Sequence, residues 1–352
     1  MNFEMSDDRR MLAESLARFL ADTCPVEKRV DVAYAEPWHS ETAWAGLAEL
    51  GALYALAPEE AGGMGGTGFD IAVVFEELGK ALCPEPVLAS LLGLRLLAAA
   101  GQDLEPVLAG ERVAVGIGEL DAPYDLDGIE TRAEDGKLTG RKSVVYGGPG
   151  AERLLIAAQS GGKLALFEVK AGDAQVTGYG MIDGGPAAEV FLDDTPGELL
   201  LEDARGALEE ALDAGALALC AEALGAMEVV QGILIDYLKT RKQFGQPIGT
   251  FQALQHRAID VGIEIEQARS IVILAASALG GPEGAKRVAQ AKFLVGRIAR
   301  LVAEEAIQMH GGIGITWEYP MAHFAKRLVM IDAQLGDTDW HLERLTEALA
   351  AE

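Results

Sequence analysis

The strongest constraint on the fold is a set of long apolar stripes with helical spacing in the last third of the chain. From residue 205 onward the chain carries one such stripe, made up of Leu217, Cys220, Leu224, Met227, Val230, Leu234 and Tyr237. Residues 254–272 carry a second, a third segment runs from about 284 to 309, and the tail from 338 gives a fourth. A face that is apolar every three or four residues is buried by packing one helix against another. We therefore predict a four-helix antiparallel bundle over residues 204–352.

The rest of the chain divides into two parts with different periodicity. Residues 1–108 again carry apolar residues at helical spacing, and Asp70 is placed to cap the helix that follows the Gly-rich turn APEEAGGMGGTGFD. Residues 109–203 contain short Val-, Leu- and Ile-rich runs such as RVAVGIGEL and KLALFEVK, separated by Gly, Asp and Pro. These runs predict a small middle β-domain, a barrel or sandwich. The predicted class is α+β multidomain, mainly α, with an N-terminal helical domain before the β-domain and the bundle after it.

Composition excludes several classes of partner. Half of the 352 residues are apolar, which is enough for a large core, and the formal net charge is -26. Such acidity argues against nucleic acid or an anionic membrane surface as a partner. The first twenty residues contain no apolar signal core, and no apolar run approaches the roughly 20 residues that span a bilayer, so we expect a cytoplasmic protein. The three cysteines are far apart without CxxC spacing, so neither a disulfide nor a zinc site is expected.

Two connections within the predicted bundle are unusual for surface loops. TRKQFGQPIGTFQALQHR, residues 240–257, surrounds a turn with basic, aromatic and amide side chains, which in an acidic chain suits an anion attached to a flat ring. QMHGGIGITWEYP, residues 308–320, has glycines that let a ligand approach the backbone. Taken singly, each stretch is more typical of an ordinary interhelix turn. The candidate binding residues in these two stretches are Arg241, Gln243, Phe244, Gln252, Gln308, Gly311 and Gly312.

Taken together, these two stretches closely resemble the acyl-CoA dehydrogenases, and so do PEEAGGMGGTGFDIAVVFEELGKAL and the order of helices, β-domain and bundle. The resemblance implies a flavoprotein with FAD at a subunit contact, in a dimer or a dimer of dimers. It further implies that Arg241 binds the pyrophosphate of the neighbouring subunit's FAD and that Phe244 packs on this cofactor. Gln308 and the backbone at Gly311 and Gly312 would hold the adenosine half. An arginine fork suits a diphosphate, and glycines let amides come close.

The reaction that the resemblance implies is α,β-dehydrogenation of an acyl-CoA thioester to the trans-2-enoyl-CoA. A carboxylate removes the α-proton while a hydride passes from the β-carbon to flavin N5. Hydrogen bonds to the thioester oxygen strengthen as enolate charge develops. An electron-transfer flavoprotein is the usual electron acceptor in this family.

The sequence departs from the family pattern at the flavin and at the base. In many members a Trp-Ile-Thr-Asn-Gly turn flanks the flavin, whereas KSVVYGG here puts Val144 at the Trp and Tyr146 at the Thr. Tyr146 is a candidate to stack on the flavin ring, although an ordinary strand tyrosine explains it equally well. The two positions at which members carry the base glutamate fall on Leu335 and Gly215, and neither can take a proton. Asp337 follows two residues after the first of them.

Three interpretations remain, and the first is favoured. The chain is an acyl-CoA dehydrogenase whose displaced base is Asp337, although this residue is also well placed to be only the N-cap of the last helix. Alternatively, it is a base-less subunit that pairs with a related, base-bearing chain, as in heteromeric members acting on bulky CoA thioesters such as steroid side chains. In the third interpretation, a helical binding or assembly protein kept the fold and lost the flavin, which the cofactor-binding motif argues against. The sequence leaves the acyl chain open.

Overall fold

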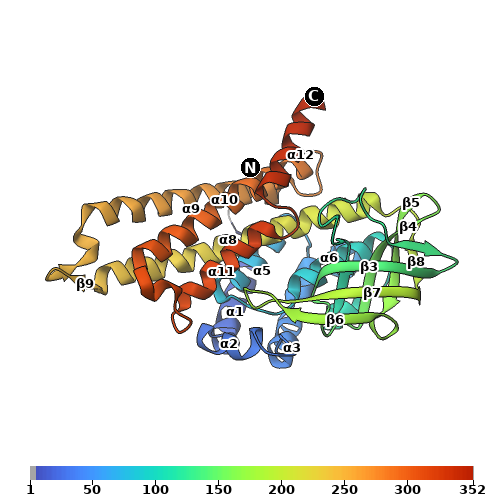
Figure 1. Cartoon of the computed structure of the whole chain (residues 1–352), viewed down its shortest axis with the longest axis horizontal. Coiled ribbons are helices and arrows are strands. Elements are labelled where there is room, and N and C mark those ends of the chain that lie inside the picture. Colours follow the sequence, from blue (N-terminus) through green and yellow to red (C-terminus); the bar gives the residue numbers. More distant parts are fainter. Residues whose placement is uncertain (1–4, 352) are drawn as a thin grey trace. The chain divides into compact units, whose positions relative to one another are not determined.

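The computed structural model describes residues 5–351, and its elements are labelled in Figure 1. The first part of the chain is helical, with α1 (Asp7–Thr23), α2 (Val26–Ala33), α3 (Glu41–Glu49), α4 (Ala52–Leu56), α5 (Gly68–Ala81), α6 (Val87–Ala99) and α7 (Glu105–Leu108). The main strands follow as β1 (Val113–Gly116), β2 (Arg132–Glu134), β3 (Lys137–Tyr146), β4 (Arg153–Ser160), β5 (Lys163–Lys170), β6 (Gln175–Gly180), β7 (Pro186–Pro196) and β8 (Glu198–Leu201). The last part contains α8 (Arg205–Thr240), the hairpin β9 (Lys242–Gln243) and β10 (Gln246–Pro247), α9 (Gln252–Ala278), α10 (Gly284–His310), α11 (Pro320–Ala333) and α12 (Thr338–Ala351).

This order confirms the predicted fold class. Helix α11, which packs against α10, was not expected from the sequence; it lies between the third and fourth expected helices along the chain. Contacts divide the chain into two compact units: unit 1 contains the segment ending at Glu27, Ile71–Cys83 and the chain from Ala216 on, and unit 2 contains Lys28–Asp70 and Pro84–Gly215. Each unit is therefore built from segments that are distant in sequence. The three-domain division at 1–108, 109–203 and 204–352 stays a prediction.

Unit 2 contains one mixed sheet in the order β6-β7-β3-β2-β4-β5-β8, with β1 paired parallel to β4. Strand β4 is buried along most of its length, so Leu154, Ile156 and Ala158 contribute to the core of the sheet together with residues of β5 and β7. Helix α6 lies directly against β1: a Cβ at Gly93 would come within 2.4 Å of Val113 Cγ1. A strand covered on both faces needs no polar alternation, which explains the continuous apolar runs in this region.

The Gly-rich turn before α5 is a tight structural turn. Asp70 lies in the first turn of α5 and accepts a hydrogen bond from the Thr67 amide at 3.0 Å, so it caps the start of the helix as expected, from inside the first turn. A Cβ at Gly65 would lie 2.5 Å from Asp70 Oδ2, and one at Gly63 would lie 2.1 Å from the Ala57 carbonyl oxygen. These glycines are therefore required by close approach within the turn itself.

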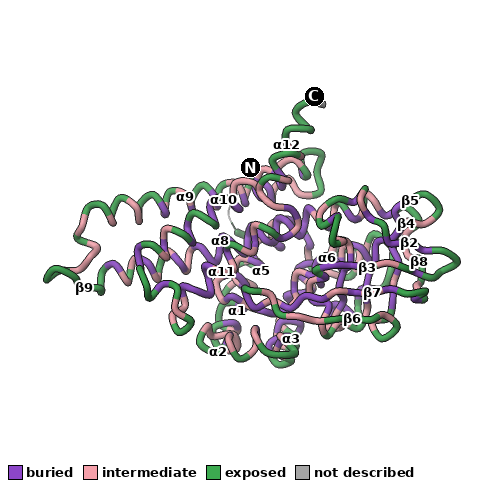
Figure 2. Tube along the Cα trace, viewed as in Figure 1, coloured by how far each residue is buried: buried purple, intermediate pink, exposed green. Residues whose placement is uncertain are grey.

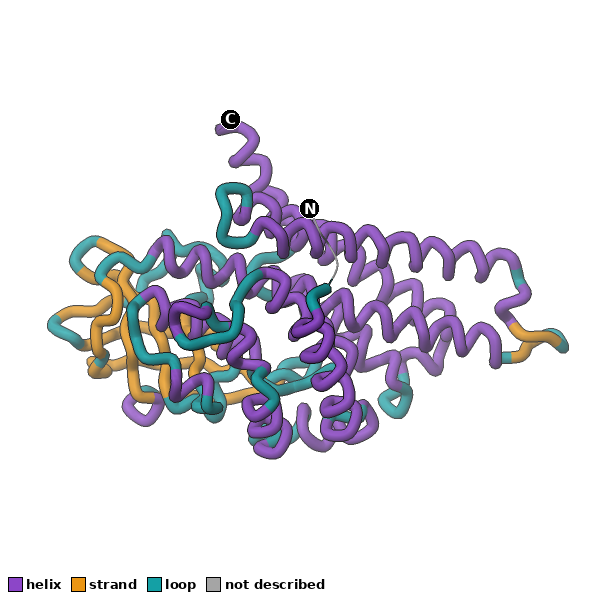
Figure 3. Tube along the Cα trace, turned by 180° about the vertical axis from the view of Figure 1, so that it is seen from behind, coloured by secondary structure: helices purple, strands orange, loops and turns teal. Residues whose placement is uncertain are grey.

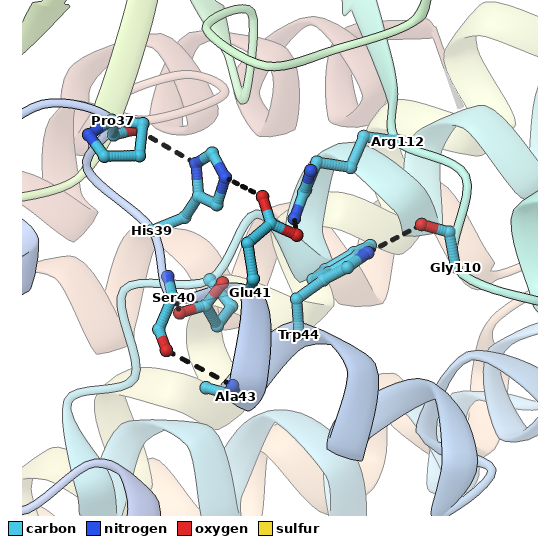
Figure 4. Close-up of polar contacts among 9 residues, drawn as sticks. Pro37, His39, Ser40, Glu41, Ala43, Trp44, Gly110 and Arg112 are labelled. Atoms are coloured by element: carbon cyan, nitrogen blue, oxygen red, sulfur yellow. Dashed lines mark hydrogen bonds and ion pairs between the residues drawn. The ribbon is translucent and has the colours of Figure 1, made fainter.

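Helix α3 is joined to the start of the sheet by the polar contacts in Figure 4. Ser40 Oγ accepts from the Ala43 amide at 3.3 Å and so begins the helix. Arg112, just before β1, donates to the Glu41 carboxylate at 2.6 Å, and Trp44 Nε1 donates to the Gly110 carbonyl at 2.7 Å. The Arg112 bond holds the pKa of Glu41 below its usual range. These bonds explain why residues 28–70 belong to the same compact unit as the sheet.

Helix α8 is the longest helix in the described part of the chain and is buried along most of its length (Figure 2). By length and composition it could cross a membrane, but 67% of its most apolar window of 18 residues is buried inside the protein. Within unit 1 it crosses α5 at glycines on both helices. A Cβ at Gly79 would lie 2.0 Å from the Glu222 carbonyl oxygen, and a Cβ at Gly225 would lie 2.0 Å from that of Glu76. The two backbones therefore touch, which no other residue type permits.

We predict that Gly225→Ala lowers the free energy of unfolding by about 1–3 kcal/mol, because the added methyl group meets backbone that cannot rotate away. Gly232→Ala in the same helix is the matched control, since nothing lies within 4 Å of its Cβ position. That change should be neutral or stabilise by roughly 0.5–1 kcal/mol, the usual gain from replacing a helical glycine. Urea unfolding of the two variants measures the difference, and equal effects would contradict the crossing.

Candidate functional site

A two-residue turn joins β9 and β10 and connects α8 to α9 (Figure 3). Phe244 and Gly245 at its tip both have positive φ, 53° and 81°, as in a type I′ turn. A phenylalanine in this backbone conformation is strained, and its side chain is 88% exposed. A strained turn that presents a large apolar side chain to the outside indicates a contact with something beyond this chain.

Arg241 lies at the base of this hairpin, directly after α8. Its amide donates to the Tyr237 carbonyl at 2.8 Å and its carbonyl accepts from the Ile248 amide at 2.8 Å, so its backbone is fixed. The side chain is exposed, and within residues 5–351 its guanidinium has neither a hydrogen bond nor an ion pair. Gln243 and Gln252 are also exposed. The hairpin therefore offers a cation and an aromatic ring to an external group.

The second candidate stretch lies at the same end of the bundle. Helix α10 ends at His310, whose ring stacks on Tyr237 with the centroids 4.5 Å apart, and the Tyr237 hydroxyl donates to the His310 carbonyl at 3.2 Å. Gly311 follows with φ 68° and ψ -148°, a conformation that favours glycine. Nothing lies within 4 Å of a Cβ at Gly311 or Gly312, and Gln308 is exposed, so a ligand has room beside this backbone.

Tyr146, the remaining cofactor candidate, belongs to unit 2. It is half-buried at the end of β3, after an irregularity in the pairing with β7 between Lys142 and Val145. Val144 has a φ of 52° and is 42% exposed. The Glu189 carboxylate holds this bulge by accepting from Ser143 Oγ at 2.8 Å and from the Val144 amide at 3.4 Å. The role of Tyr146 toward a flavin stays a prediction.

The loop between α11 and α12 carries the candidate base. Asp337 Oδ1 accepts from the Trp340 amide at 2.8 Å, so the interpretation of Asp337 as the N-cap of the last helix is confirmed. The residue is half-buried, and Oδ2 has no hydrogen-bond partner within the described part of the chain. Leu335 has a positive φ of 53°, and Gly215 is buried in α8. A cap and a free carboxylate oxygen thus coexist at Asp337.

A buried lysine of α10 holds this loop in place. Lys292 of α10 is completely buried, and its Nζ donates to the Asp332 carbonyl at 2.8 Å and to the Gly336 carbonyl at 2.7 Å. Burial lowers the pKa of Lys292. One turn further along α10, Gly296 makes room for the loop: a Cβ there would lie 2.2 Å from Asp332 Oδ1. Both ends of the loop are therefore bound to one ammonium group.

Other side chains hold the residues in between. Burial, with the Lys292 ammonium adding to it, lowers the pKa of His341 to about 3, so its neutral ring donates from Nε2 to the Leu335 carbonyl at 3.1 Å. Arg327 donates to Gln334 Oε1 at 2.8 Å and forms two bonds of 2.6 Å with the Glu222 carboxylate of α8. Each residue from 334 to 336 is thereby fixed by a side chain of the bundle.

The role of Lys292 in holding this loop was not expected from the sequence. Lys292 lies between Val288 and Val295 on the buried face of α10, so a single charge inside an apolar stripe was the available signal. Charged residues in helices are usually solvated, and only the packing reveals that this one is not.

An exposed arginine and aromatic ring on one hairpin, with an open glycine stretch at the same end of the bundle, suit a phosphate-bearing cofactor that has a flat ring. Residues 6–104 match the family described as acyl-CoA dehydrogenase, N-terminal domain, and residues 205–350 match acyl-CoA dehydrogenase, C-terminal domain. The chain is also 32% identical over 327 residues to the acyl-CoA dehydrogenase IpdE2 of Mycobacterium tuberculosis, which covers 91% of each chain. The protein belongs to the acyl-CoA dehydrogenase family. This confirms the expected FAD-dependent acyl-CoA dehydrogenase at the level of the family.

Two solved structures are similar over the whole chain. The Tcur3481-Tcur3483 steroid ACAD, solved as a G363A variant, is 29% identical with a TM-score of 0.88 and 98% of each chain covered. The ChsE4-ChsE5 complex from Mycobacterium tuberculosis has a TM-score of 0.91 with all of both chains covered. Its identity of 24% shows the fold alone.

We predict that Lys292→Met releases the loop before α12. Each lost bond from the ammonium to a buried carbonyl costs about 1.5–3 kcal/mol locally, and both carbonyls are left without this donor. Hydrogen exchange should show at least a tenfold loss of protection at the Trp340 and His341 amides, which corresponds to about 1.4 kcal/mol. Arg300→Met on the exposed face of the same helix is the control and should leave these amides unchanged. Unaltered protection in Lys292→Met would show that Lys292 does not hold the loop in place.

We also predict that Arg241→Ala weakens FAD binding. A charge-assisted bond to phosphate contributes on the order of 1.5–3 kcal/mol, so the dissociation constant should rise roughly ten- to a hundredfold. Lys242→Ala removes the same charge from the same hairpin and should cause a much smaller loss, because it lacks the planar fork. Titration of apoprotein with FAD measures both variants. Equal losses would mean that only the general charge of the hairpin matters.

Proposed function

We propose that this chain is the FAD-binding, base-less subunit of a heteromeric acyl-CoA dehydrogenase, and that a related partner chain supplies the carboxylate that removes the α-proton. The observation that carries the proposal is the loop before α12. The residues at the two usual base positions, Leu335 and Gly215, cannot take a proton, and the neighbouring carboxylate of Asp337 caps a helix.

The free energies of the bonds that hold the loop favour this proposal over a base displaced to Asp337. For Asp337 to act from a position two residues late, the loop has to bend differently. Loss of the helix cap at Asp337 costs only about 1 kcal/mol, which would not prevent the loop from bending. The two bonds from Lys292, at about 1.5–3 kcal/mol each, are the larger obstacle, because they fix both ends of the loop.

The chain's own residues have separable roles in this proposal. FAD, when bound, supplies the acceptor for the hydride that leaves the β-carbon. The Arg241 fork binds its pyrophosphate, and the exposed Phe244 ring covers it from the hairpin of the adjacent subunit. The open backbone at Gly311 and Gly312 offers amides to the adenosine half. The loop before α12, which Lys292 holds, carries the apolar Leu335 where many members of the family carry the carboxylate.

The substrate class we propose is a bulky CoA thioester such as a steroid side chain. Support comes from the similarity to a steroid ACAD named for two components. An apolar groove along α9 supports association with another chain: Ile259 and Ile263 are 59% and 54% exposed and line it beside Gly262. An electron-transfer flavoprotein is the proposed electron acceptor.

A second candidate function is a homomeric dehydrogenase that uses Asp337 itself. The observation in its favour is the Oδ2 atom, which has no hydrogen-bond partner among residues 5–351. In this case the cap on Oδ1 would orient the carboxylate, and Oδ2 would take the proton.

Flavin reduction by a panel of acyl-CoAs separates the two candidates. We predict that the chain purified alone binds FAD without being reduced, that co-expression with a base-bearing relative restores reduction, and that Asp337→Asn has no effect in the complex. Asn caps as well as Asp but cannot accept a proton, so the variant isolates chemistry from stability. If wild type is reduced alone and Asp337→Asn slows this at least about a hundredfold, Asp337 is the base and the subunit proposal fails.

A further inference from the structure

Two cysteines that are 59 residues apart in sequence meet at the ends of two helices of unit 1. Cys24 follows α1 and Cys83 lies just beyond the end of α5, and each is followed by a proline. Their sulfur atoms are 3.9 Å apart, with the Cys24 thiol directed at Cys83 Sγ. We propose that Cys24 and Cys83 form a redox-active dithiol that closes to an intramolecular disulfide, a modification site separate from the acyl-CoA chemistry.

The backbone on both sides of the pair is fixed by helix caps. The Cys24 amide donates to the Leu20 carbonyl at 2.8 Å and ends α1. Helix α5 ends in a Schellman motif: Leu82 has a φ of 48° and donates to Gly79, while the Cys83 amide donates to the Leu78 carbonyl at 3.0 Å. With the backbone held, side-chain rotation has to bring the sulfur atoms from 3.9 Å to about 2.05 Å, the length of a disulfide bond.

The third cysteine provides an internal contrast. Cys24 and Cys83 are half-buried and accessible to a small oxidant, whereas Cys220 is completely buried in α8. Burial raises the pKa of Cys220 to about 12, so its thiol stays protonated and unreactive. Oxidation should therefore consume two of the three thiols and leave the third.

The oxidant is a small-molecule disulfide of the glutathione type. One cysteine, as thiolate, attacks a sulfur atom of the oxidant, forms a mixed disulfide and releases one thiol. The second cysteine then attacks the protein sulfur of the mixed disulfide and releases the other thiol. In sum, the two protein thiols lose two electrons and two protons, and one oxidant disulfide is reduced to two thiols.

The position of the pair determines the consequence of the bond. The first segment of unit 1 ends at Glu27 and the second ends at Cys83, so the sulfur atoms lie close to two points at which the chain passes into unit 2. A disulfide closes the intervening chain into one long loop and joins α1 covalently to α5. Closing a long loop restricts the unfolded chain strongly, so the oxidised protein should unfold at a higher temperature.

Oxidised glutathione and dithiothreitol test the proposal on the purified chain, without any substrate. We expect oxidation to remove two of the three thiols, to lower the intact mass by two hydrogen atoms, to give a peptide linking Cys24 to Cys83 and to raise Tm. Dithiothreitol should reverse all of these changes. Cys220→Ala is the matched control: it should lose both of its two thiols and otherwise behave like wild type.

Cys24→Ser and Cys83→Ser should each form only a glutathione adduct, without the rise in Tm. The proposal is overturned if wild type also stops at adducts, retains all three thiols, or forms only links between chains on a non-reducing gel. Each of these outcomes leaves the proposed dehydrogenase function untouched, because neither cysteine is assigned a part in it.

Discussion

The buried ammonium of Lys292 is the interaction on which the candidate active-site loop depends. It binds the carbonyls of Asp332 and Gly336, and so joins the end of α11 to the start of α12 through a single group on α10. A buried charge without a carboxylate in direct contact is costly, and it persists only where its donors satisfy groups that would otherwise be orphaned. Around it, His341 and Arg327 hold the residues between the two carbonyls. The loop thus behaves as part of the bundle core.

This rigidity decides how the missing base is interpreted. From the sequence alone, Asp337 was the favoured replacement, provided that the loop could bend to offset its position. The two hydrogen bonds from Lys292 restrict this bending, and breaking them costs more free energy than breaking the helix cap at Asp337. The choice between a displaced base and a partner's base therefore rests on backbone support, which residue spacing does not reveal.

Sequence reasoning succeeded where a signal is local and failed where it is long-range. The stripe of Leu217, Leu224 and Leu234 predicted α8, and Asp70 predicted the cap of α5, because helix periodicity and capping depend on neighbours within a few residues. Lys292 was missed because a lone charge in a stripe normally points to solvent. The approach of Cys24 to Cys83 was missed because sequence separation carries no information on which helix ends meet in the fold. Helix α11 was missed as well.

Backbone strain supplies a last argument about the origin of the site. Of the seven described non-glycine residues with positive φ, three stand at positions to which the family resemblance gives functional meaning: Val144, Phe244 and Leu335. Such conformations cost about 1–3 kcal/mol each and persist only where the surroundings impose them. Val144 and Leu335 do not carry the family's tryptophan and glutamate, yet the backbone is strained at both. A chain that had lost its site altogether would be free to relax this strain, whereas a subunit that still has to present these loops to a cofactor and a partner would not.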